Sequence, residues 1–361
     1  MIWFSYSFPT PSAVTRRDSP MEIGIDFKTY HIHVSHKSAK IPVRRKNMKL
    51  DSFLKLVPSY RDYVWGGDRL RSGHRPTAEA WVVWEEDEIE SGSLAGKTLG
   101  EAAIQFGDAL LGAKAMTRTG TRFPLLIKLL DCAQWLSLQV HPNDQQAVEL
   151  EGPGQFGKTE AWHILDSQPN STLIAGLKPD TSAETLAASI RGGTVIEHVQ
   201  YAAVSAGDTI FMPAGTLHAL GPGLLVYEVQ QTSDWTYRVY DWGRPQTEKR
   251  PLHTEKSIQV TRADFTAPII AMPDCEDGTQ HTLVQCEYFT LEILCASINS
   301  INLDTKRESF HAITVIEGKA VLQARDESLE LNKFQTAVIP SSAGNYQFQP
   351  LTGCRALKSS S

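Results

Sequence analysis

From Met48 onward the chain is broken into many short apolar runs, and their length limits the folds it can adopt. The runs hold roughly four to eight residues and are separated by Gly, Pro, Asn and Asp. Examples are EAWVVW, PLLIKLLD, WLSLQVH, EAWHIL, TLIAGL, DTIFMP, LLVYEVQQ and YRVYDW. Such runs are typical of β-strands, and many in succession predict a mainly β protein with a sandwich or barrel such as a jelly roll.

Two stretches have helical spacing instead. TSAETLAASIRGG has Thr181 or Ser182 as the N-cap, Glu184 in the first turn and Gly192-Gly193 as the stop. TLGEAAIQFGDALLG, residues 98–112, also has apolar residues at helical spacing. We therefore expect short helices inserted among the strands.

The length of 361 residues, 41% of them apolar, provides for a sizeable core and more than one domain. We expect one strand-rich domain over residues 48–265 and a smaller one over 266–361. AGDTIFMPAGTLHAL and LNKFQTAVIPSSAGNYQF both contain an apolar strand that ends at Pro before a turn of small residues. The first has His218 and the second has Asn345 nearby, so an internal duplication in which one copy keeps a ligand explains the pair.

Residues 1–47 differ in composition from the rest. They carry 8 Lys and Arg against 3 Asp and Glu, whereas the remainder carries 27 against 38. They contain no run that fits a signal peptide. We interpret them as a disordered extension or as the product of an upstream start codon chosen in error. His31 and His33 lie there without acidic or turn residues around them, and we do not expect a metal site.

Net charge, hydropathy and cysteine content exclude several classes of protein. The net charge of -6 gives no sign of nucleic-acid binding, and no run of 18 apolar residues is present to cross a membrane. The five cysteines include no CxxC pair, which argues against a disulfide framework or a thiolate zinc site. We expect a cytoplasmic protein with free thiols.

The stretch LSLQVHPND places two polar side chains on one face of an apolar strand. Gln139 and His141 are two residues apart, so they point the same way. In GDTIFMPAGTLHAL, Gly207, Pro213, Gly215 and His218 follow one another with gaps of five, one and two residues. That spacing resembles the second motif of the cupin superfamily, in which the turn places a metal-binding histidine at the start of a strand.

Further stretches resemble one cupin family, the type I mannose-6-phosphate isomerases. They are QVHPND, GKTEAWHIL, EVQQTSDWTYRVYDWGR, YRDYVWGGDRL and FPLLIKLLD. The resemblance covers about residues 49–262 closely and the rest loosely. It implies a cupin jelly-roll barrel with a short helical insertion, in the compact bacterial-type form, and a degenerate cupin-like second domain without metal ligands.

By position, the resemblance implies that one Zn²⁺ per chain is held by four residues: Gln139, His141, Glu160 and His218. Two imidazoles, one carboxylate and one amide oxygen suit zinc and leave room for water or substrate, which is the arrangement of a catalytic site. The alternative for each residue alone is a satisfied polar side chain in a barrel core.

Lys158 shares a strand face with Glu160, so its ammonium lies beside the expected metal. A nearby dication lowers the pKa of a lysine, and such a lysine can move protons. The alternative is a structural ion pair with Glu160. His163 points to the opposite face and is expected in the core. Gly157 stands where larger members of the family often have His, so a ring-opening role given to that His needs another group, for example water.

Arg238 matches the family's active-site arginine. If its segment is extended, Asp234, Thr236 and Tyr240 share its face. A guanidinium there stabilises negative charge on an enediolate, and Asp234 would orient it. The alternative is a surface ion pair.

Lys128 lies inside the apolar run PLLIKLLD, where a charge is costly unless its end reaches water or an anion. Ser137 shares a face with Gln139 and His141. Both are candidates to hold a substrate phosphate, and for Lys128 the alternative is that its stem lies along apolar surface with its ammonium in water.

The function implied by the resemblance is the interconversion of D-mannose 6-phosphate and D-fructose 6-phosphate through a cis-enediol. Lys158 is the first choice as proton carrier, with water at the metal or Glu160 as alternatives. An iron dioxygenase is disfavoured because such enzymes draw on three or more histidines. A non-catalytic, metal-containing sugar-phosphate sensor remains the main alternative. We expect a small-molecule sugar phosphate partner, no nucleic acid, no membrane, and a monomer or weak homodimer.

Overall fold

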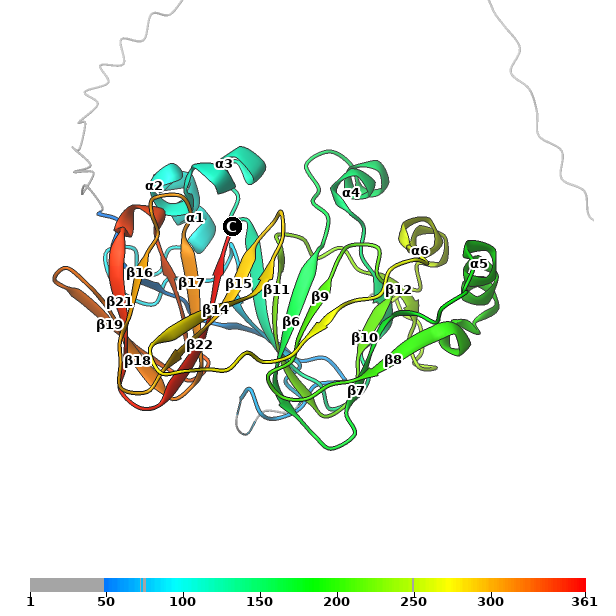
Figure 1. Cartoon of the computed structure of the whole chain (residues 1–361). Helices are drawn as coiled ribbons and strands as arrows, with labels where there is room; N and C mark the ends of the chain where they lie inside the picture. The colour runs from blue at the N-terminus through cyan, green and yellow to red at the C-terminus, as the bar shows by residue number, and fades with distance from the viewer. Residues whose placement is uncertain (1–48, 72, 74–75, 249) are drawn as a thin grey trace, which may run out of the picture. The chain divides into compact units, whose positions relative to one another are not determined.

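The computed structural model describes residues 49–71, 73, 76–248 and 250–361, so the predictions for residues 1–47, His31 and His33 lie outside the described residues. The described chain is mainly β, and its paired strands run antiparallel (Figure 1). Antiparallel sheets are the expected result of many short strands joined by tight turns.

Two sheets form the part that contains the predicted ligands. The strands of the larger sheet are β2 (Ser59–Arg61), β3 (Glu79–Val83), β4 (Leu125–Asp131), β6 (Glu160–Ser167), β9 (Thr209–Met212), β11 (Leu224–Gln231) and β13 (Ile269–Ile270). Its spatial order is β13-β9-β6-β11-β4-β3-β2. The smaller sheet has the order β12-β5-β10-β7-β8, with β5 (Leu138–Val140), β7 (Thr172–Leu177), β8 (Val199–Ala203), β10 (His218–Leu220) and β12 (Tyr237–Tyr240).

The central strands of the larger sheet are buried on both faces. Every residue of β4 and of β11 is buried. One face carries Ile127, Tyr227 and Val229, which belong to a cluster that also holds Leu291 and Phe310 from later in the chain. Burial on both sides explains why these strands read as nearly continuous apolar runs rather than as alternating ones.

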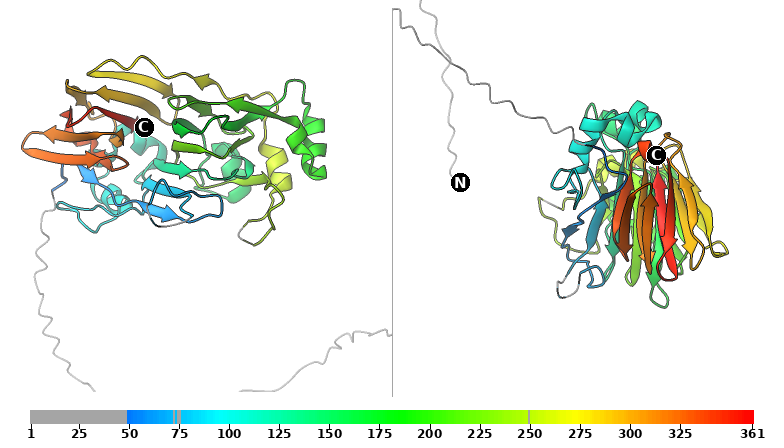
Figure 2. Two further views of the ribbon diagram at one scale, coloured as in Figure 1. Left: turned by 90° about the horizontal axis from the view of Figure 1, so that it is seen from below. Right: turned by 90° about the vertical axis from the view of Figure 1, so that its left-hand side faces the viewer.

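The later strands form a second pair of sheets. They are seen on the left of Figure 1 and side by side in the right-hand view of Figure 2. The strands β1 (Leu54–Lys55), β14 (Thr279–Gln285), β15 (Thr290–Ala296), β17 (His311–Glu317), β20 (Thr336–Ile339) and β22 (Cys354–Ser360) make one sheet. The strands β16 (Ile301–Asp304), β18 (Lys319–Ala324), β19 (Glu327–Asn332) and β21 (Asn345–Pro350) make the other. A separate apolar cluster that includes Leu294, Val315, Leu322 and Phe348 draws on both sheets.

Two short strands each pair with a sheet whose other strands come from the opposite side of residue 265 in the sequence. β1 comes from the start of the described chain and pairs with β20 of the later sheet. β13 comes from beyond residue 265 and pairs with β9 of the earlier sheet. The domain division at residue 265 stays a prediction, and the two halves exchange these strands.

The helix predicted over residues 181–193 is present as α5 (Ala183–Gly192), capped by the Ser182 hydroxyl, with Gly193 in the left-handed conformation. The helix predicted over 98–112 is divided at Gly107, whose φ of 48° ends α1 (Leu99–Phe106) before α2 (Asp108–Leu111) begins. The sequence analysis missed α3 (Ala113–Thr119), α4 (Asp144–Glu151) and α6 (Thr254–Val260). Each is short, and a polar helix such as α4, whose one buried residue is Ala147, has little apolar periodicity to detect.

The expectation that all five cysteines are free thiols is wrong for two of them. A disulfide joins Cys275 to Cys295, with their Cα atoms 5.6 Å apart, while Cys132, Cys286 and Cys354 are free. Cys295 lies in β15, opposite Thr279 of β14, and Cys275 precedes β14. The register of these two strands brings the two thiols together, and spacing along the chain does not reveal it.

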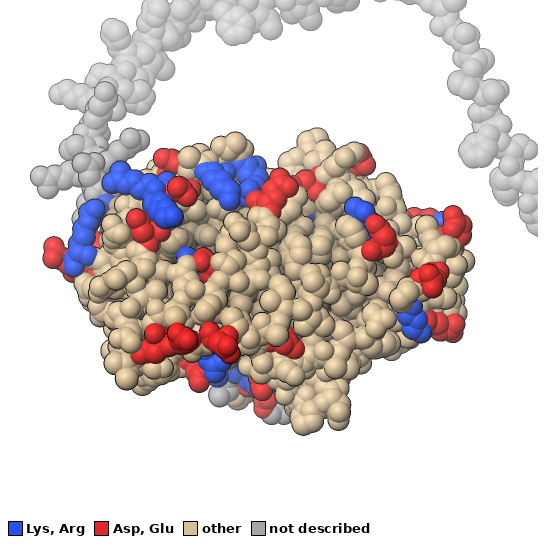
Figure 3. All heavy atoms as spheres, in the orientation of Figure 1, with Lys and Arg blue, Asp and Glu red and all other residues tan. Residues whose placement is uncertain are grey.

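Charges of both signs are present on the face drawn in Figure 3. Lys and Arg gather at its upper left, a row of Asp and Glu lies below them, and uncharged surface separates the two. Within the described residues, no helix combines the length and the hydropathy that a membrane span requires. The absence of nucleic-acid partners stays a prediction.

Candidate active site

The smaller sheet brings three predicted site residues into one row. Gln139 of β5 is paired with His218 of β10 on one side and with Arg238 of β12 on the other. Directly opposite residues of neighbouring strands have their side chains close together on one face. His141 follows β5, and its backbone oxygen accepts a hydrogen bond of 2.9 Å from the amide of Gly215 in the turn before β10. That turn contains the glycine of the predicted motif, with a φ of 90°.

Glu160, the first residue of β6, completes the predicted cluster. Its carboxylate oxygens lie 3.5 Å from His141 Nε2 and 3.3 Å from His218 Nε2. One ligand atom from each of the three residues lies within 4.8 Å of the others, and all three side chains are buried. The structure therefore brings together three of the four predicted ligands in a geometry that suits one metal ion.

The hydrogen bonds of the two histidines leave their Nε2 atoms as acceptors. His141 Nδ1 donates to the backbone oxygen of Trp235 at 2.8 Å, and His218 Nδ1 donates to that of Thr216 at 2.8 Å. Burial lowers the pKa of His141 far below its usual value and the pKa of His218 to about 4, so both rings are neutral near pH 7. Neutral imidazoles with one nitrogen held by a backbone carbonyl are the form that binds metals.

The chemistry of this cluster fits a cation. His141 Nε2 and Glu160 Oε1 are buried and have no hydrogen-bond partner among the described residues, and the other Glu160 oxygen faces the ammonium of Lys158 at 3.2 Å. Burial, with a contribution from Glu228, raises the pKa of Glu160 to about 7. Buried acceptors that face one another without a donor are costly, and a metal ion between them would remove that cost.

Gln139 lies beside the cluster in a different orientation from that of a ligand. Its amide nitrogen is 3.3 Å from His218 Nε2. To bind a metal there, the amide has to turn so that its oxygen takes the place of the nitrogen. Gln139 therefore lies beside His218, as predicted, and its role as a ligand stays a prediction.

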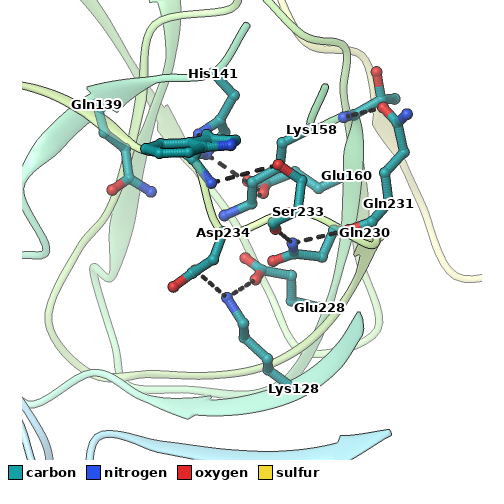
Figure 4. Close-up of polar contacts among 12 residues, drawn as sticks. Lys128, Gln139, His141, Lys158, Glu160, Glu228, Gln230, Gln231, Ser233 and Asp234 are labelled. Atoms are coloured by element: carbon teal, nitrogen blue, oxygen red, sulfur yellow. Dashed lines mark hydrogen bonds and ion pairs between the residues drawn. The ribbon is translucent and has the colours of Figure 1, made fainter. Parts of the chain in front are cut away.

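Lys158 is buried next to Glu160, as their spacing predicts. Its ammonium nitrogen lies 3.2 Å from a Glu160 carboxylate oxygen, and the two side chains lie side by side in Figure 4. His163, expected in the core, is buried on the other side of β6, where it hydrogen-bonds the Thr209 hydroxyl at 2.9 Å.

Lys128 belongs to a second buried charged group. Its ammonium lies 3.2 Å from Glu228 and 3.8 Å from Asp234, on either side of it in Figure 4. Burial acts to lower the pKa of Lys128, but Glu228, Glu79 and Asp234 outweigh it and raise the pKa, so this lysine stays charged. The expected pairing of Asp234 with Arg238 is thus replaced by a pairing with Lys128.

Arg238 has other partners. Its guanidinium donates to the backbone oxygen of Pro251 at 3.1 Å, and its Nε lies 4.0 Å from Asp241. Asp241 also binds Arg250 through both carboxylate oxygens, at 2.8 and 3.0 Å, and Arg244 at 3.1 Å. Three guanidinium groups therefore share one carboxylate, and the Nε of Arg238 remains without an acceptor among the described residues.

Gln139, Lys158, Lys128 and Arg238 border one cavity of about 610 Å³, whereas the buried side chains of His141, Glu160 and His218 lie outside its lining. Its polar lining includes Lys128, Ser137, Gln139, Lys158, Glu228, Asp234, Thr236, Arg238, Arg250 and His253, and its aromatic lining includes Tyr63, Trp65, Trp81 and Trp162. A cavity of this size that combines aromatic walls with a few converging polar groups is typical of small-molecule sites.

The sequence analysis missed Glu228 and Arg250. Glu228 is a single acid inside the apolar run LLVYEVQQ, which is the same signal that identified Lys128, and the two are paired across β11 and β4. Trp162 Nε1 donates to Glu228 at 2.9 Å. Arg250 lies in a loop, and no pattern in the sequence marked it.

The chain matches two family models. Residues 53–159 match the catalytic domain of type I phosphomannose isomerase, and residues 279–353 match the cupin domain of mannose-6-phosphate isomerase. It is 32% identical over 315 residues to mannose-6-phosphate isomerase ManA of Bacillus subtilis (strain 168), covering 82% of this chain and 96% of that one. It is 31% identical to the mannose-6-phosphate isomerase of Streptococcus mutans over 79% of this chain and 91% of that one.

Solved structures show the same fold. The mannose 6-phosphate isomerase of Bacillus subtilis has a TM-score of 0.77 at 31% identity, with 86% of this chain and 99% of that chain covered. A putative mannosephosphate isomerase from Archaeoglobus fulgidus has a TM-score of 0.69 at 21% identity, covering 86% of this chain and 98% of that one. These matches confirm the predicted cupin fold class. The chain belongs to the type I mannose-6-phosphate isomerase family.

Proposed function

We propose that this protein is a zinc-dependent isomerase that interconverts D-mannose 6-phosphate and D-fructose 6-phosphate through a cis-enediol. The observation that carries the proposal is that the buried cluster of His141, Glu160 and His218 lies beside Lys158, which is 3.2 Å from Glu160. Lys158 lines one cavity together with Gln139 and Arg238. Relatives that carry this name match most of the chain.

Zinc bound by His141, Glu160, His218 and Gln139 would act as a Lewis acid on the substrate oxygens at C1 and C2. We propose that Lys158 carries the proton between these carbons. Its nitrogen lies 3.2 Å from Glu160 and lines the cavity, which places it within reach of a bound sugar.

Arg238 supplies positive charge as the enediolate develops. Its Nε is buried and lacks an acceptor, so it can bind a developing anion without first losing another partner. Asp234 remains in the proposal as a cavity-lining carboxylate beside Lys128.

The phosphate group is assigned to Lys128 and Ser137, which both line the cavity. Lys128 already has two carboxylate neighbours, Glu228 and Asp234. Their negative charges would repel a phosphate dianion bound close to Lys128. Arg238 and Arg250, which share Asp241, line the same cavity and supply positive charge that opposes this repulsion. The cytoplasmic location and the state of monomer or weak homodimer stay predictions.

The decisive experiment is a coupled assay on purified protein of known metal content. Mannose 6-phosphate is supplied and fructose 6-phosphate is followed, before chelation, after chelation, and after return of Zn²⁺, Mn²⁺ or Co²⁺. We expect turnover that disappears with the metal and returns best with zinc. A protein that retains one metal per chain and shows no turnover would instead be a sugar-phosphate sensor.

A further inference from the structure

Three hydrogen bonds to two other segments, residues 142–144 and Gln231, hold the main chain around Lys158. Lys158 precedes β6, so no strand ladder holds it. The amide of Gly157 donates to Asp144 Oδ1 at 2.7 Å, and the amide of Lys158 donates to the backbone oxygen of Pro142 at 2.9 Å. The amide of Thr159 donates to Gln231 Oε1 at 2.8 Å. These bonds fix the path of the chain on both sides of the lysine.

Asp144 connects two of these contacts. The same oxygen that accepts from Gly157 also accepts from Gln231 Nε2, at 2.9 Å. Asp144 therefore holds Gly157 directly and Thr159 through Gln231, one on each side of Lys158. A carboxylate oxygen that accepts from two such donors is hard to displace.

The main chain at Gly157 is packed closely against the main chain of Asn143 and Asp144. A Cβ atom at this position would lie 2.5 Å from the backbone of Asn143 and Asp144. The two chain segments are thus in direct backbone contact, which only glycine permits. This contact also explains why the histidine found here in larger relatives cannot be accommodated without a shift of the chain.

We propose that Asp144 is a positioning residue for Lys158, because its carboxylate holds the main chain on both sides of the lysine. The inference rests on the proposed role of Lys158 as proton carrier. Asp144 contacts neither the cavity lining nor the predicted metal ligands directly, so its effect passes through the backbone of residues 157–159. A displacement of about 1 Å in a reacting group can lower turnover by about 100-fold.

The test compares Asp144→Ala with Asp144→Asn in the full chain loaded with zinc. Alanine removes the acceptor for Gly157 and Gln231, so we expect kcat to fall roughly 10- to 100-fold with KM and metal content unchanged. Asparagine keeps an oxygen for both donors, so kcat should return to within about threefold of the unchanged protein. A crystal structure of Asp144→Ala should show Lys158 moved away from Glu160.

Asn143→Ala is the matched control, because it removes a cap of the same helix without removing the acceptor for Gly157. Equal losses of kcat in Asn143→Ala and Asp144→Ala would overturn the inference, as would unchanged kcat in Asp144→Ala. If Asp144→Ala does not fold, Gln231→Ala serves, because it removes the acceptor for Thr159, with an expected fall in kcat of about 3- to 10-fold at constant KM and metal content. Unchanged kcat in that variant would also overturn it. Inactivity of the unchanged protein would refute the proposed function instead.

Discussion

At the residue scale, buried charges are the signal that best marked the site. Lys128 is a lone charge within an apolar run, and the structure places it 4% exposed beside Glu228. The i, i+2 spacings in LSLQVHPND and GKTE placed His141 and Glu160 correctly because strand side chains alternate between faces. The pairing of Lys128 with Glu228 and Asp234 was not predictable in this way, since it depends on which strands are neighbours and in what register.

The first prediction concerns the two cationic residues of the proposed mechanism. We expect Lys158→Met to lower kcat by at least about 100-fold, because it removes the proton carrier. Arg238→Ala should lower kcat by about 100-fold, because it removes charge that the enediolate needs. Both variants should keep one metal per chain by elemental analysis. Unchanged turnover in Lys158→Met would remove this residue from the mechanism.

A second prediction concerns Asp87, a buried carboxyl remote from the metal ligands in sequence. Ser59 donates to one of its oxygens at 2.8 Å, and the other oxygen has no partner. Burial raises the pKa of Asp87 from 3.8 to about 7. Between those values the folded protein binds a proton that the unfolded chain does not, so this contribution to stability is complete below pH 3.8 and is lost as the pH rises through 7.

Asp87→Asn removes this titration. Its free energy of unfolding, relative to that of the unchanged protein, should increase by roughly 4 kcal/mol between pH 4 and pH 8. Urea unfolding at the two pH values measures this difference. Asp326→Asn, a change at an exposed position, should show no such dependence. A constant difference for Asp87→Asn would show that this carboxyl titrates normally.

At the scale of elements, the strands and the longest helix were predictable and the short polar helices were not. α5 was predictable because its sequence has a Ser182 cap, apolar residues at helical spacing and a terminal Gly-Gly. α4 has the same kind of start, in which the Asn143 side chain accepts from Gln146 and the Gln146 side chain accepts from Asn143. Without an apolar stripe, however, the letters PNDQQ read as a turn. The cap explains why the strand just before His141 stops so abruptly.

The two caps give a paired prediction about stability. Asn143→Ala and Ser182→Ala each remove a side-chain acceptor at a helix N-terminus, so each should lower the free energy of unfolding by about 1 kcal/mol. Neither side chain lines the cavity, so kcat should stay within about threefold. Denaturant titration and the coupled assay measure both effects. A much larger loss of stability for Asn143→Ala than for Ser182→Ala would show that its side chain has another role.

At the scale of the whole molecule, the two halves share one apolar cluster. Tyr227 and Val229 of β11 lie in the same cluster as Leu291 and Phe310. The Tyr227 hydroxyl also hydrogen-bonds Ser359 at 2.9 Å. Neither contact was visible in the sequence, because each joins segments that are distant along the chain. A strand buried on both faces was the only available sign that something covers the larger sheet.

A fragment of residues 49–265 should therefore fail to fold independently. It would lose β13 from the edge of β9 and expose the apolar outer face of β4 and β11 to water. We expect it to aggregate or to unfold without a cooperative transition, whereas residues 49–361 should unfold cooperatively. Calorimetry and light scattering distinguish the two. Cooperative unfolding and metal binding by the fragment would establish residues 48–265 as an autonomous domain.

The pairing of β1 with β20 has a consequence for synthesis of the protein. Leu54 is paired with Val338, 284 residues later. At about 5 to 20 residues per second, a ribosome needs roughly 15 to 60 s to make the second strand after the first. During that interval Phe53 and Leu54, both destined for the core, remain on an unpaired segment open to chaperones or to aggregation. The molecule therefore has a high contact order and completes its folding only when nearly all of the chain has left the ribosome.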